Sequence, residues 1–329
     1  MTVGSFAFPK ASELFQDDVF THIDGILVQP VFMKIEAFNA AGSVKLKTAL
    51  NLINSMEDEG HIFPHSKIIE SSSGNLGVAL SMVCAARGYA FTCVVDPNAS
   101  PRNIKIMEAL GARIVTISKP DENGGYLGSR IQYIKERLAE DPDTIWTNQY
   151  ANAANVEAHR KWTAVAIDRR FPRLDYLFIG AGTTGTLMGC VKHFRAHRPA
   201  VKIVAVDAIG SVTFGHKPGK RHIPGLGTSR RPEIFDPAGL YAMEMVDERD
   251  AIAMCRYLAR HHGLLAGGST GTVLAAVMAW KPHIPKEAVV GTISPDLGER
   301  YLDSIYNDEW VRERYGEIPR LRFSPATAA

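Results

Sequence analysis

Cysteine is scarce in this chain, which has only four in 329 residues. They are Cys84, Cys93, Cys190 and Cys255, and none forms a C-x-x-C pair or stands beside a histidine at ligand spacing. A disulfide framework or a structural zinc site needs such groupings. We therefore expect four separate thiols that act as small buried apolar residues in a reducing cytosol, and no metal site.

Long apolar runs and an excess of one charge are also absent. No apolar run reaches membrane-spanning length, and Met1–Phe6 lacks the basic segment and apolar core of a secretory signal. There are 37 Lys and Arg against 35 Asp and Glu, and no basic run is interleaved with aromatic residues. We therefore expect a cytoplasmic protein that has neither nucleic acid nor membrane as a partner.

What the sequence does contain is a repeated alternation of short apolar runs and helical periodicity, with turns of Gly, Ser, Asn or Asp between them. This alternation predicts parallel βαβ units and an α/β fold. The length exceeds one typical domain. We place a boundary at the polar segment 146–150, which gives domains 1–148 and 149–329, and the first residues can cross to the second domain.

The expected elements follow from apolar periodicity. We expect strands at 28–35, 67–70, 89–95, 112–117, 176–179, 202–206, 241–246, 264–266 and 288–293. We expect helices at 44–56, 78–87, 101–110, 153–169, 186–196, 248–261 and 273–280, and one opened by 123–126 that runs to 138. Residues 1–28 show little regular pattern, and 210–237 form a long irregular segment.

The turn Gly180–Thr186 stands between an apolar strand and a helix, and it reads Gly-Ala-Gly-Thr-Thr-Gly-Thr. Glycines let the backbone approach a ligand, and the N–H groups at a helix start favour an anion, so the turn predicts a phosphate cup. The letters also spell G-x-G-x-x-G, and Asp207 ends the next strand at about the distance of a ribose-binding acid. A nicotinamide-dependent oxidoreductase is therefore one open interpretation.

Three further turns of this kind stand at helix starts. Lys45 lies in a first helical turn, where the dipole opposes a cation and favours the neutral, nucleophilic amine. The turn Ser71–Gly77 offers hydroxyls and amides that can hold a carboxylate, and Gly267–Thr272 offers another serine. In an open parallel sheet such turns gather at one edge, where ligands bind. A ligand with one phosphate, one imine-forming aldehyde and one ring nitrogen fits this set, and pyridoxal 5'-phosphate (PLP) is such a ligand.

With these four motifs in this order, the chain resembles the fold-type II PLP enzymes of the cysteine synthase and cystathionine β-synthase group along nearly its whole length. The resemblance implies a tryptophan synthase β-like fold of two α/β domains, with mostly parallel sheets flanked by helices, and a homodimer. It implies that Lys45 is catalytic and forms the Schiff base, that Asn75 binds the cofactor's 3'-oxygen, and that Ser269 faces the pyridine nitrogen. It assigns the cofactor phosphate to Gly182, Thr183, Thr184, Gly185 and Thr186, and the substrate carboxylate to Ser72, Ser73, Gly74 and Asn75.

Within this group, segments such as Cys93–Pro97 and Asn148–Asn152 are most similar to the siderophore-pathway enzymes that make N-(2-amino-2-carboxyethyl)-L-glutamate, a precursor of 2,3-diaminopropionate. That resemblance implies O-phospho-L-serine as the first substrate and L-glutamate as the nucleophile. Anionic substrates require cations. We nominate Arg130, with Tyr150 beside it, and two weaker candidates, Arg221 and Arg230.

Two departures from the family pattern and two alternatives remain. Leu46-Lys47 stand where the family has Asp-Arg, and Gly182 stands where the siderophore enzymes have a serine. Sulfide or homocysteine would attack the same carbon, so a cysteine synthase, an O-phosphoserine sulfhydrylase or a cystathionine β-synthase-like enzyme stays open. A ligand binder without turnover is a third class, against which the intact Lys45 argues.

Overall fold

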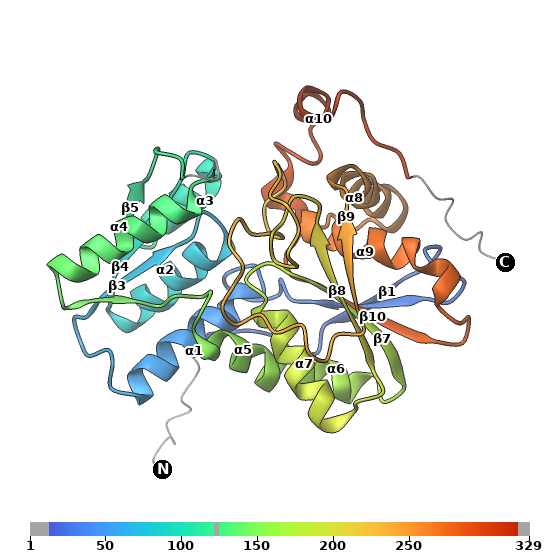
Figure 1. The fold of residues 1–329 in the computed structure, drawn as a ribbon, viewed down its shortest axis with the longest axis horizontal. Helices are drawn as coiled ribbons and strands as arrows, with labels where there is room; N and C mark the ends of the chain where they lie inside the picture. Colours follow the sequence, from blue (N-terminus) through green and yellow to red (C-terminus); the bar gives the residue numbers. More distant parts are fainter. Residues whose placement is uncertain (1–12, 122–124, 322–329) are drawn as a thin grey trace, which may run out of the picture.

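The computed structural model describes residues 13–121 and 125–321, and Figure 1 shows an α/β protein with two sheets. The strands are β1 (Phe20–Ile23), β2 (Val31–Ile35), β3 (Lys67–Ser71), β4 (Ala90–Val95), β5 (Arg113–Thr116), β6 (Thr144–Trp146), β7 (Leu174–Gly180), β8 (Lys202–Ala208), β9 (Ala242–Val246) and β10 (Val289–Ser294). The α-helices are α1 (Lys45–Asp58), α2 (Asn75–Arg87), α3 (Pro101–Ala109), α4 (Leu127–Glu140), α5 (Ala153–Ala158), α6 (Val165–Arg170), α7 (Gly185–His197), α8 (Glu248–His262), α9 (Gly268–Ala279) and α10 (Asp308–Tyr315).

The larger sheet has six strands in the order β1-β2-β10-β7-β8-β9, and the smaller has four in the order β5-β4-β3-β6. All neighbouring strands are parallel except the edge pair β1 and β2. Central strands such as β7 and β8 are apolar along almost their whole length because helices cover both faces of the sheet. The predicted α/β fold with mostly parallel sheets is confirmed.

Strands β1 and β2 come from the first 35 residues, yet they belong to the sheet that the second half of the chain builds. The smaller sheet lies wholly within residues 67–146. The division into domains 1–148 and 149–329 stays a prediction.

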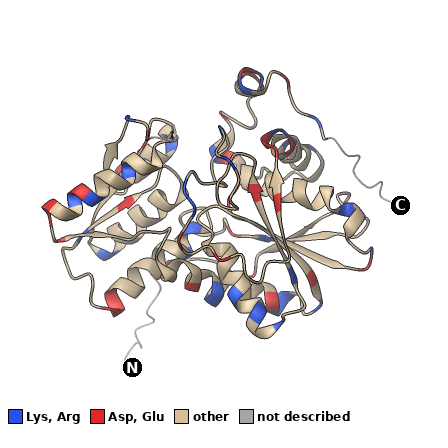
Figure 2. Ribbon diagram, viewed as in Figure 1, with Lys and Arg blue, Asp and Glu red and all other residues tan. Residues whose placement is uncertain are grey.

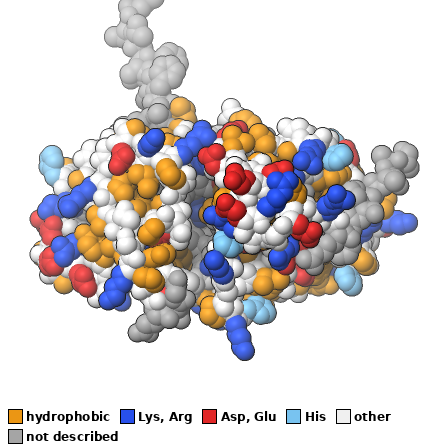
Figure 3. Space-filling model, turned by 90° about the horizontal axis from the view of Figure 1, so that it is seen from above, with side chains coloured by type: hydrophobic (Ala, Val, Ile, Leu, Met, Phe, Trp, Pro, Cys, Tyr) orange, Lys and Arg blue, Asp and Glu red, His pale blue; other side chains and the backbone are white. Residues whose placement is uncertain are grey.

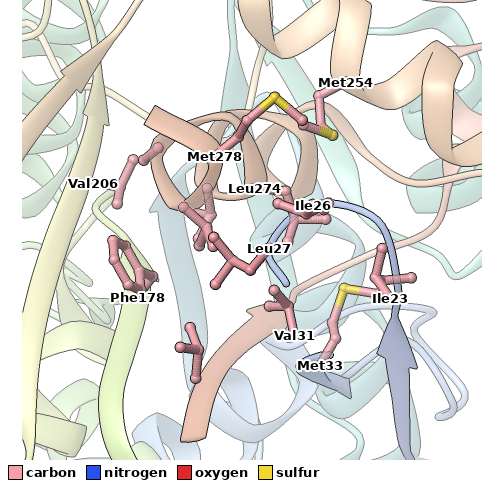
Figure 4. Close-up of a cluster of buried hydrophobic side chains, with 14 of the residues drawn as sticks. Ile23, Ile26, Leu27, Val31, Met33, Phe178, Val206, Met254, Leu274 and Met278 are labelled. Atoms are coloured by element: carbon pink, nitrogen blue, oxygen red, sulfur yellow. The ribbon is translucent and has the colours of Figure 1, made fainter. Parts of the chain in front are cut away.

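The largest apolar cluster packs α8 and α9 against the six-stranded sheet (Figure 4). Phe178 and Val206 come from β7 and β8, and they face Leu274 and Met278 on α9. Helix α9 carries no charged residue and is buried almost all round, as expected of a helix between a sheet and another helix. Each fully buried side chain of this kind contributes roughly 1.5–3 kcal/mol. This cluster fixes the start of α9 relative to the strand ends.

Several expected elements differ from the structure. The expectation of no regular structure before residue 28 was wrong for β1, which pairs with β2 as a four-residue antiparallel edge. Strand β6 and helix α10 were also not expected. The expected strand 264–266 is only an isolated bridge between Ala266 and Leu297.

Helical boundaries differ too. Helices α2 and α9 begin at Asn75 and Gly268 rather than at 78 and 273, because their first turns are made of the small polar residues that we assigned to loops. The expected helix 153–169 is divided by a π-helical turn, η2 (His159–Ala164). The residues 123 and 124, expected to open α4, and the amino-terminal residues Met1–Phe6 lie outside the described ranges.

Charged residues of both signs are spread over both halves of the molecule (Figure 2), and they alternate with apolar side chains on the face seen in Figure 3. Within the described ranges, no helix has the length and apolarity needed to cross a membrane. In the same ranges, no three His, Cys, Asp or Glu side chains are grouped as metal ligands. All four cysteines are buried and free, which confirms the expectation of inert small residues.

Candidate active site

Lys45 is the first residue of α1, and the chain after β10 holds this helix start in place. The N–H of Val44 donates to the carbonyl of Pro295 at 2.8 Å, and Ser43 forms an isolated bridge with Asp296. Burial lowers the pKa of the Lys45 ammonium to about 8, although the carboxylate of Asp296 acts in the opposite direction. The amine is therefore partly neutral near neutral pH, as a nucleophile requires.

The start of α2 lies beside that of α1. Ser72 caps it, because its Oγ accepts from the N–H groups of Gly77 at 3.0 Å and Gly74 at 3.4 Å. Both bonds use the oxygen, so the hydroxyl hydrogen of Ser72 stays available to an anion. Asn75 donates from Nδ2 to Oδ2 of Asp296 at 2.7 Å. The structure thus brings the turn Ser71–Gly77, the predicted carboxylate loop, to the segment after β10 that holds the start of the Lys45 helix.

The turn Gly180–Thr186 follows β7 and leads into α7, as the sequence predicts. Thr184 is the N-cap residue in a left-handed conformation, with φ of 68°, and its buried Oγ1 has no hydrogen-bond partner among the described residues. A Cβ on Gly182 would lie 2.7 Å from the carbonyl oxygen of Gly225, so glycine is required at this close approach. An orphaned hydroxyl at a glycine-lined helix start fits a bound phosphate.

A buried polar network contacts Thr183 and Thr186 of the phosphate cup. Asn155 donates from Nδ2 to Oγ1 of Thr183 at 3.2 Å, which leaves the hydroxyl hydrogen of Thr183 free for the cup. Thr48, on the helix of Lys45, donates to Oδ1 of Asn155 at 3.1 Å. Nε2 of His159 lies 3.0 Å from Oγ1 of Thr48 and 3.3 Å from Oγ1 of Thr186. The network therefore connects the lysine helix with the phosphate cup.

His159 itself is neutral. Burial lowers its pKa well below the ordinary value, and the charges of Lys45 and Lys47 lower it further. Its Nδ1 lies 3.1 Å from Oγ1 of Thr163, one turn further along η2. A π-helical turn at this point agrees with the frequent placement of such turns at functional sites.

Ser269 is buried in the first turn of α9. A Cβ on Gly225 would lie 3.5 Å from its Oγ, and the N–H of Gly227 donates to the carbonyl of Ala181 at 3.1 Å. The segment 225–227 of the long irregular loop therefore bridges the cup and Ser269. The glycine-rich part of that loop belongs to the site.

Arg130 is nearly buried and contacts the carboxylate loop directly. Its guanidinium donates to Oγ of Ser73 at 2.8 Å and pairs with Asp96 at 3.3 Å. The hydroxyl of Ser73 in turn donates to Asp96 at 2.7 Å. Nε of Arg130 has no partner among the described residues, so the cation keeps capacity for a further anion.

The charges of all three nominated arginines act on the hydroxyl of Tyr150. Burial raises the pKa of its hydroxyl, while Arg130, Arg221 and Arg230 each act to lower it. The guanidinium of Arg221 donates to the carbonyl of Gly210 at 2.5 Å. Arg230 forms an exposed ion pair with Glu233.

Sequence reasoning missed four residues that shape this site, namely Glu70, Asn155, His159 and Asp296. Glu70 is a buried carboxylate that accepts from Trp146, Thr147 and the N–H groups of Ser71 and Gln149, and so holds the segment before Tyr150. Asp296 comes two residues after the end of β10, and an acid near a strand end is the same kind of signal that drew attention to Asp207. Asn155 and His159 gave no signal, because a polar side chain on a helix normally faces solvent.

Asp207 is not placed to bind a ribose. Its Oδ1 accepts from the N–H of Ala208 at 2.7 Å, and burial raises the pKa of its carboxyl to about 6. A fully buried carboxyl that accepts from the backbone beside it has little to offer a ribose. The dinucleotide interpretation therefore lacks its acid.

The comparison with protein families agrees with this geometry: residues 21–296 match the model described as "Pyridoxal-phosphate dependent enzyme". The chain belongs to this family, and its cofactor is PLP. The nicotinamide interpretation is accordingly wrong.

Two relatives carry the name N-(2-amino-2-carboxyethyl)-L-glutamate synthase. The one from Ralstonia nicotianae is 44% identical over 282 residues, which are 85% of this chain and 83% of the relative. The one from Cupriavidus metallidurans is 41% identical over 305 residues, which are 91% and 89% of the two chains.

Solved structures show the same fold. A crystal structure of O-ureido-L-serine synthase aligns with a TM-score of 0.84 and 31% identity, covering 94% of this chain and 96% of the other. An O-acetylserine dependent cystathionine beta-synthase from Helicobacter pylori aligns with a TM-score of 0.84 and 28% identity, covering 92% and 99%. The predicted membership of the fold-type II group is confirmed.

Proposed function

We propose that the protein catalyses the β-replacement of O-phospho-L-serine by L-glutamate, with N-(2-amino-2-carboxyethyl)-L-glutamate and phosphate as products. The observation that carries the proposal is the position of Arg130, which is held by Ser73 and Asp96 at the carboxylate loop and has a free Nε. A cation there suits a substrate whose β-substituent is itself an anion. The names of both relatives support the same product.

When bound, PLP supplies an electron sink that makes the α-proton of an amino acid removable. Lys45 would hold the cofactor through Nζ, and Nζ would then remove the α-proton of phosphoserine and return it to the product. Its lowered pKa supports this role. Gly182, Thr183, Thr184, Gly185 and Thr186 would hold the cofactor phosphate, and the neutral hydroxyl of Ser269 would face the ring nitrogen.

Asn75 would bind the 3'-oxygen with the amide hydrogen that Asp296 does not use. Ser72, with its hydroxyl hydrogen free, and the N–H groups around Ser73 and Gly74 would receive the substrate carboxylate. Arg130 and Tyr150 would receive the phosphate of the first substrate or a carboxylate of the second. Arg221 and Arg230 are already engaged, so they are not expected to bind substrate directly.

The wider setting follows from the family resemblance. We propose a cytoplasmic homodimer that supplies a 2,3-diaminopropionate precursor for siderophore synthesis. The balanced charge and the absence of an apolar spanning helix in residues 13–121 and 125–321 support a protein without a nucleic-acid or membrane partner.

The decisive experiment measures phosphate release from O-phospho-L-serine with glutamate, sulfide and homocysteine in turn, and identifies each product by mass. We expect fast phosphate release only when glutamate is the nucleophile, with N-(2-amino-2-carboxyethyl)-L-glutamate as the product. Faster turnover with sulfide would instead assign a cysteine synthase. A shift of the visible cofactor band without any release would assign a ligand binder.

A further inference from the structure

The buried network beside the phosphate cup has a fixed hydrogen-bond direction. Nδ2 of Asn155 donates to the backbone carbonyl of Gln149 at 2.8 Å. A carbonyl only accepts, so the orientation of this amide is settled and its oxygen, Oδ1, faces Thr48. The hydroxyl of Thr48 has a single hydrogen, which it donates to Oδ1 at 3.1 Å. Any further polar partner of Oγ1 of Thr48 must therefore be a donor.

That further partner identifies the tautomer of His159. Nε2 lies 3.0 Å from Oγ1 of Thr48, so Nε2 carries the hydrogen and donates it. The ring is neutral, because burial lowers its pKa well below the ordinary value, and its other nitrogen, Nδ1, is then an acceptor. The hydroxyl of Thr163 lies 3.1 Å from Nδ1 and is the donor, while its oxygen accepts from Nζ of Lys47 at 3.4 Å. Glu36 competes for the hydrogen of Thr163, but Lys47 already donates to this carboxylate at 3.0 Å.

The tautomer decides what the threonines of the cup can offer a ligand. Nε2 of His159 also lies 3.3 Å from Oγ1 of Thr186. Because Nε2 already carries a hydrogen, it cannot accept the hydrogen of the Thr186 hydroxyl, which stays available. Nδ2 of Asn155 likewise donates to Oγ1 of Thr183 at 3.2 Å and leaves that hydroxyl hydrogen free. A phosphate presents only acceptor oxygens, so both hydrogens suit it.

Close packing holds the ring in this place. A Cβ on Gly185 would collide with Oδ1 of Asn155, and one on Gly189 would lie 2.6 Å from Cβ of His159. Both glycines belong to α7, the helix that starts at the cup. His159 and Asn155 are fully buried. The network and the cup helix therefore touch directly, so a change in the network reaches the cup.

We propose that His159 is a positioning residue of the phosphate cup, which as the Nε2–H tautomer turns the hydroxyl hydrogen of Thr186 toward the cofactor phosphate. It acts on Thr183 in the same sense, through Thr48 and Asn155. The inference rests on the cup that the proposed function assigns to residues 182–186. It concerns cofactor binding and needs no particular substrate or nucleophile.

The first test observes the tautomer directly. Nitrogen NMR of the full-length apoprotein with isotope-labelled histidine shows which ring nitrogens carry a hydrogen. The signals of His159 are assigned by nuclear Overhauser effects to the methyl group of Thr163. We expect a hydrogen on Nε2 and none on Nδ1 at neutral pH. A hydrogen on Nδ1, alone or together with one on Nε2, would overturn the proposal.

The second test measures the Kd of the apoprotein for PLP. His159→Leu removes the Nε2 donor at similar volume, so the Thr186 hydroxyl is no longer held toward the phosphate. The Kd should rise about tenfold or more, the scale of one hydrogen bond to a charged group. His159→Gln returns an amide N–H near the place of Nε2 and should restore most of the affinity. The phosphorus NMR signal of bound PLP should move in His159→Leu and return toward the wild-type position in His159→Gln.

His193→Leu is the matched control. His193 is also buried, but it contacts Asp168 at 2.8 Å instead of the cup, so this variant should change neither the Kd nor the phosphorus signal. Equal Kd values in wild type and His159→Leu would contradict the proposal. So would a loss of affinity that is as large in His159→Gln, because packing alone would then explain it.

If His159→Leu does not fold, the tautomer in the wild-type protein decides alone. Neither test uses phosphoserine or glutamate. A failed β-replacement assay therefore leaves this inference standing, and its own failure leaves the proposed reaction untouched.

Discussion

At the scale of single residues, Lys45 shows how the fold tunes one amine. The sequence predicts a lysine at a helix start, where the dipole disfavours its charge. The structure adds burial, which is the main cause of its lowered pKa, and the opposing carboxylate of Asp296. Neither of the last two effects can be predicted from the sequence, because both depend on the folded surroundings of Lys45, to which distant residues such as Asp296 contribute.

The lowered pKa of Lys45 predicts a pH dependence for the apoprotein. With a pKa of about 8, roughly a tenth of the amine is neutral at pH 7 and nine tenths at pH 9. Labelling of Lys45 by an amine reagent should therefore speed up about tenfold over this range. Peptide mass mapping measures it, with the exposed Lys105 in the same digest as the reference for the reagent. A rate that still rises steeply above pH 9 would contradict the shift.

Arg130 gives a second prediction. Arg130→Gln removes a cation held against Ser73 and Asp96, so the KM for phosphoserine should rise roughly tenfold or more, since hydrogen bonds to charged groups are worth about 1.5–3 kcal/mol. The absorption of bound PLP should stay unchanged. Arg137→Gln, two turns along α4 in an exposed pair with Glu140, is the control and should behave as wild type. An unchanged KM in Arg130→Gln would remove this residue from the substrate site.

At the scale of elements, the sequence predicts the position of the glycine and serine turns better than the exact bounds of the helices. The glycine and serine turns at the starts of α1, α2, α7 and α9 stand where the sequence predicts, because backbone conformation and capping are local properties, although α2 and α9 begin within their turns. The π-helical turn inside the expected helix 153–169 is not local. It places His159 under the cup through contacts with Thr48 and Thr186, which come from other helices.

The buried neutral His159 makes the fold sensitive to acid. Its folded pKa is well below the ordinary value of 6.5, so between these two values the unfolded chain binds one more proton than the folded one. The free energy of unfolding should therefore fall as pH drops below about 6.5, by up to ~1.4 kcal/mol per pH unit.

His159→Gln should flatten this dependence. Denaturant titrations of the apoprotein between pH 5 and 7 measure the slope, and His61→Gln, at an exposed position, serves as the control. If the His159→Gln slope equals that of wild type, another group causes the acid sensitivity.

At the scale of the whole molecule, a buried ion cluster ties the amino-terminal segment to the lysine helix. Nζ of Lys47 lies 2.8 Å from Oε2 of Glu36 and also contacts Asp17. Lys34 lies 3.4 Å from Oε1 of Glu36, and Lys34, Glu36 and Lys47 are at most 1% exposed. The cluster joins α1 to β2 of the six-stranded sheet.

Removing one partner of such a cluster leaves a buried charge uncompensated. Lys47→Met should therefore lower the free energy of unfolding by about 3 kcal/mol. Lys67→Met breaks the exposed pair with Asp141 and should lower the free energy of unfolding far less, because solvent screens an exposed pair. Guanidinium midpoints compare the two variants, and equal shifts would show that the cluster adds nothing beyond a surface ion pair.

The placement of β2 between β1 and β10 has a consequence for biosynthesis. β2 ends at Ile35, so it is synthesised long before its parallel neighbour β10, which spans residues 289–294. The four-stranded sheet, complete by residue 146, can form while the ribosome is still working. The larger sheet has to wait for β10, so a nascent chain released before residue 289 would lack the strand that lies between β2 and β7 and could not complete this sheet.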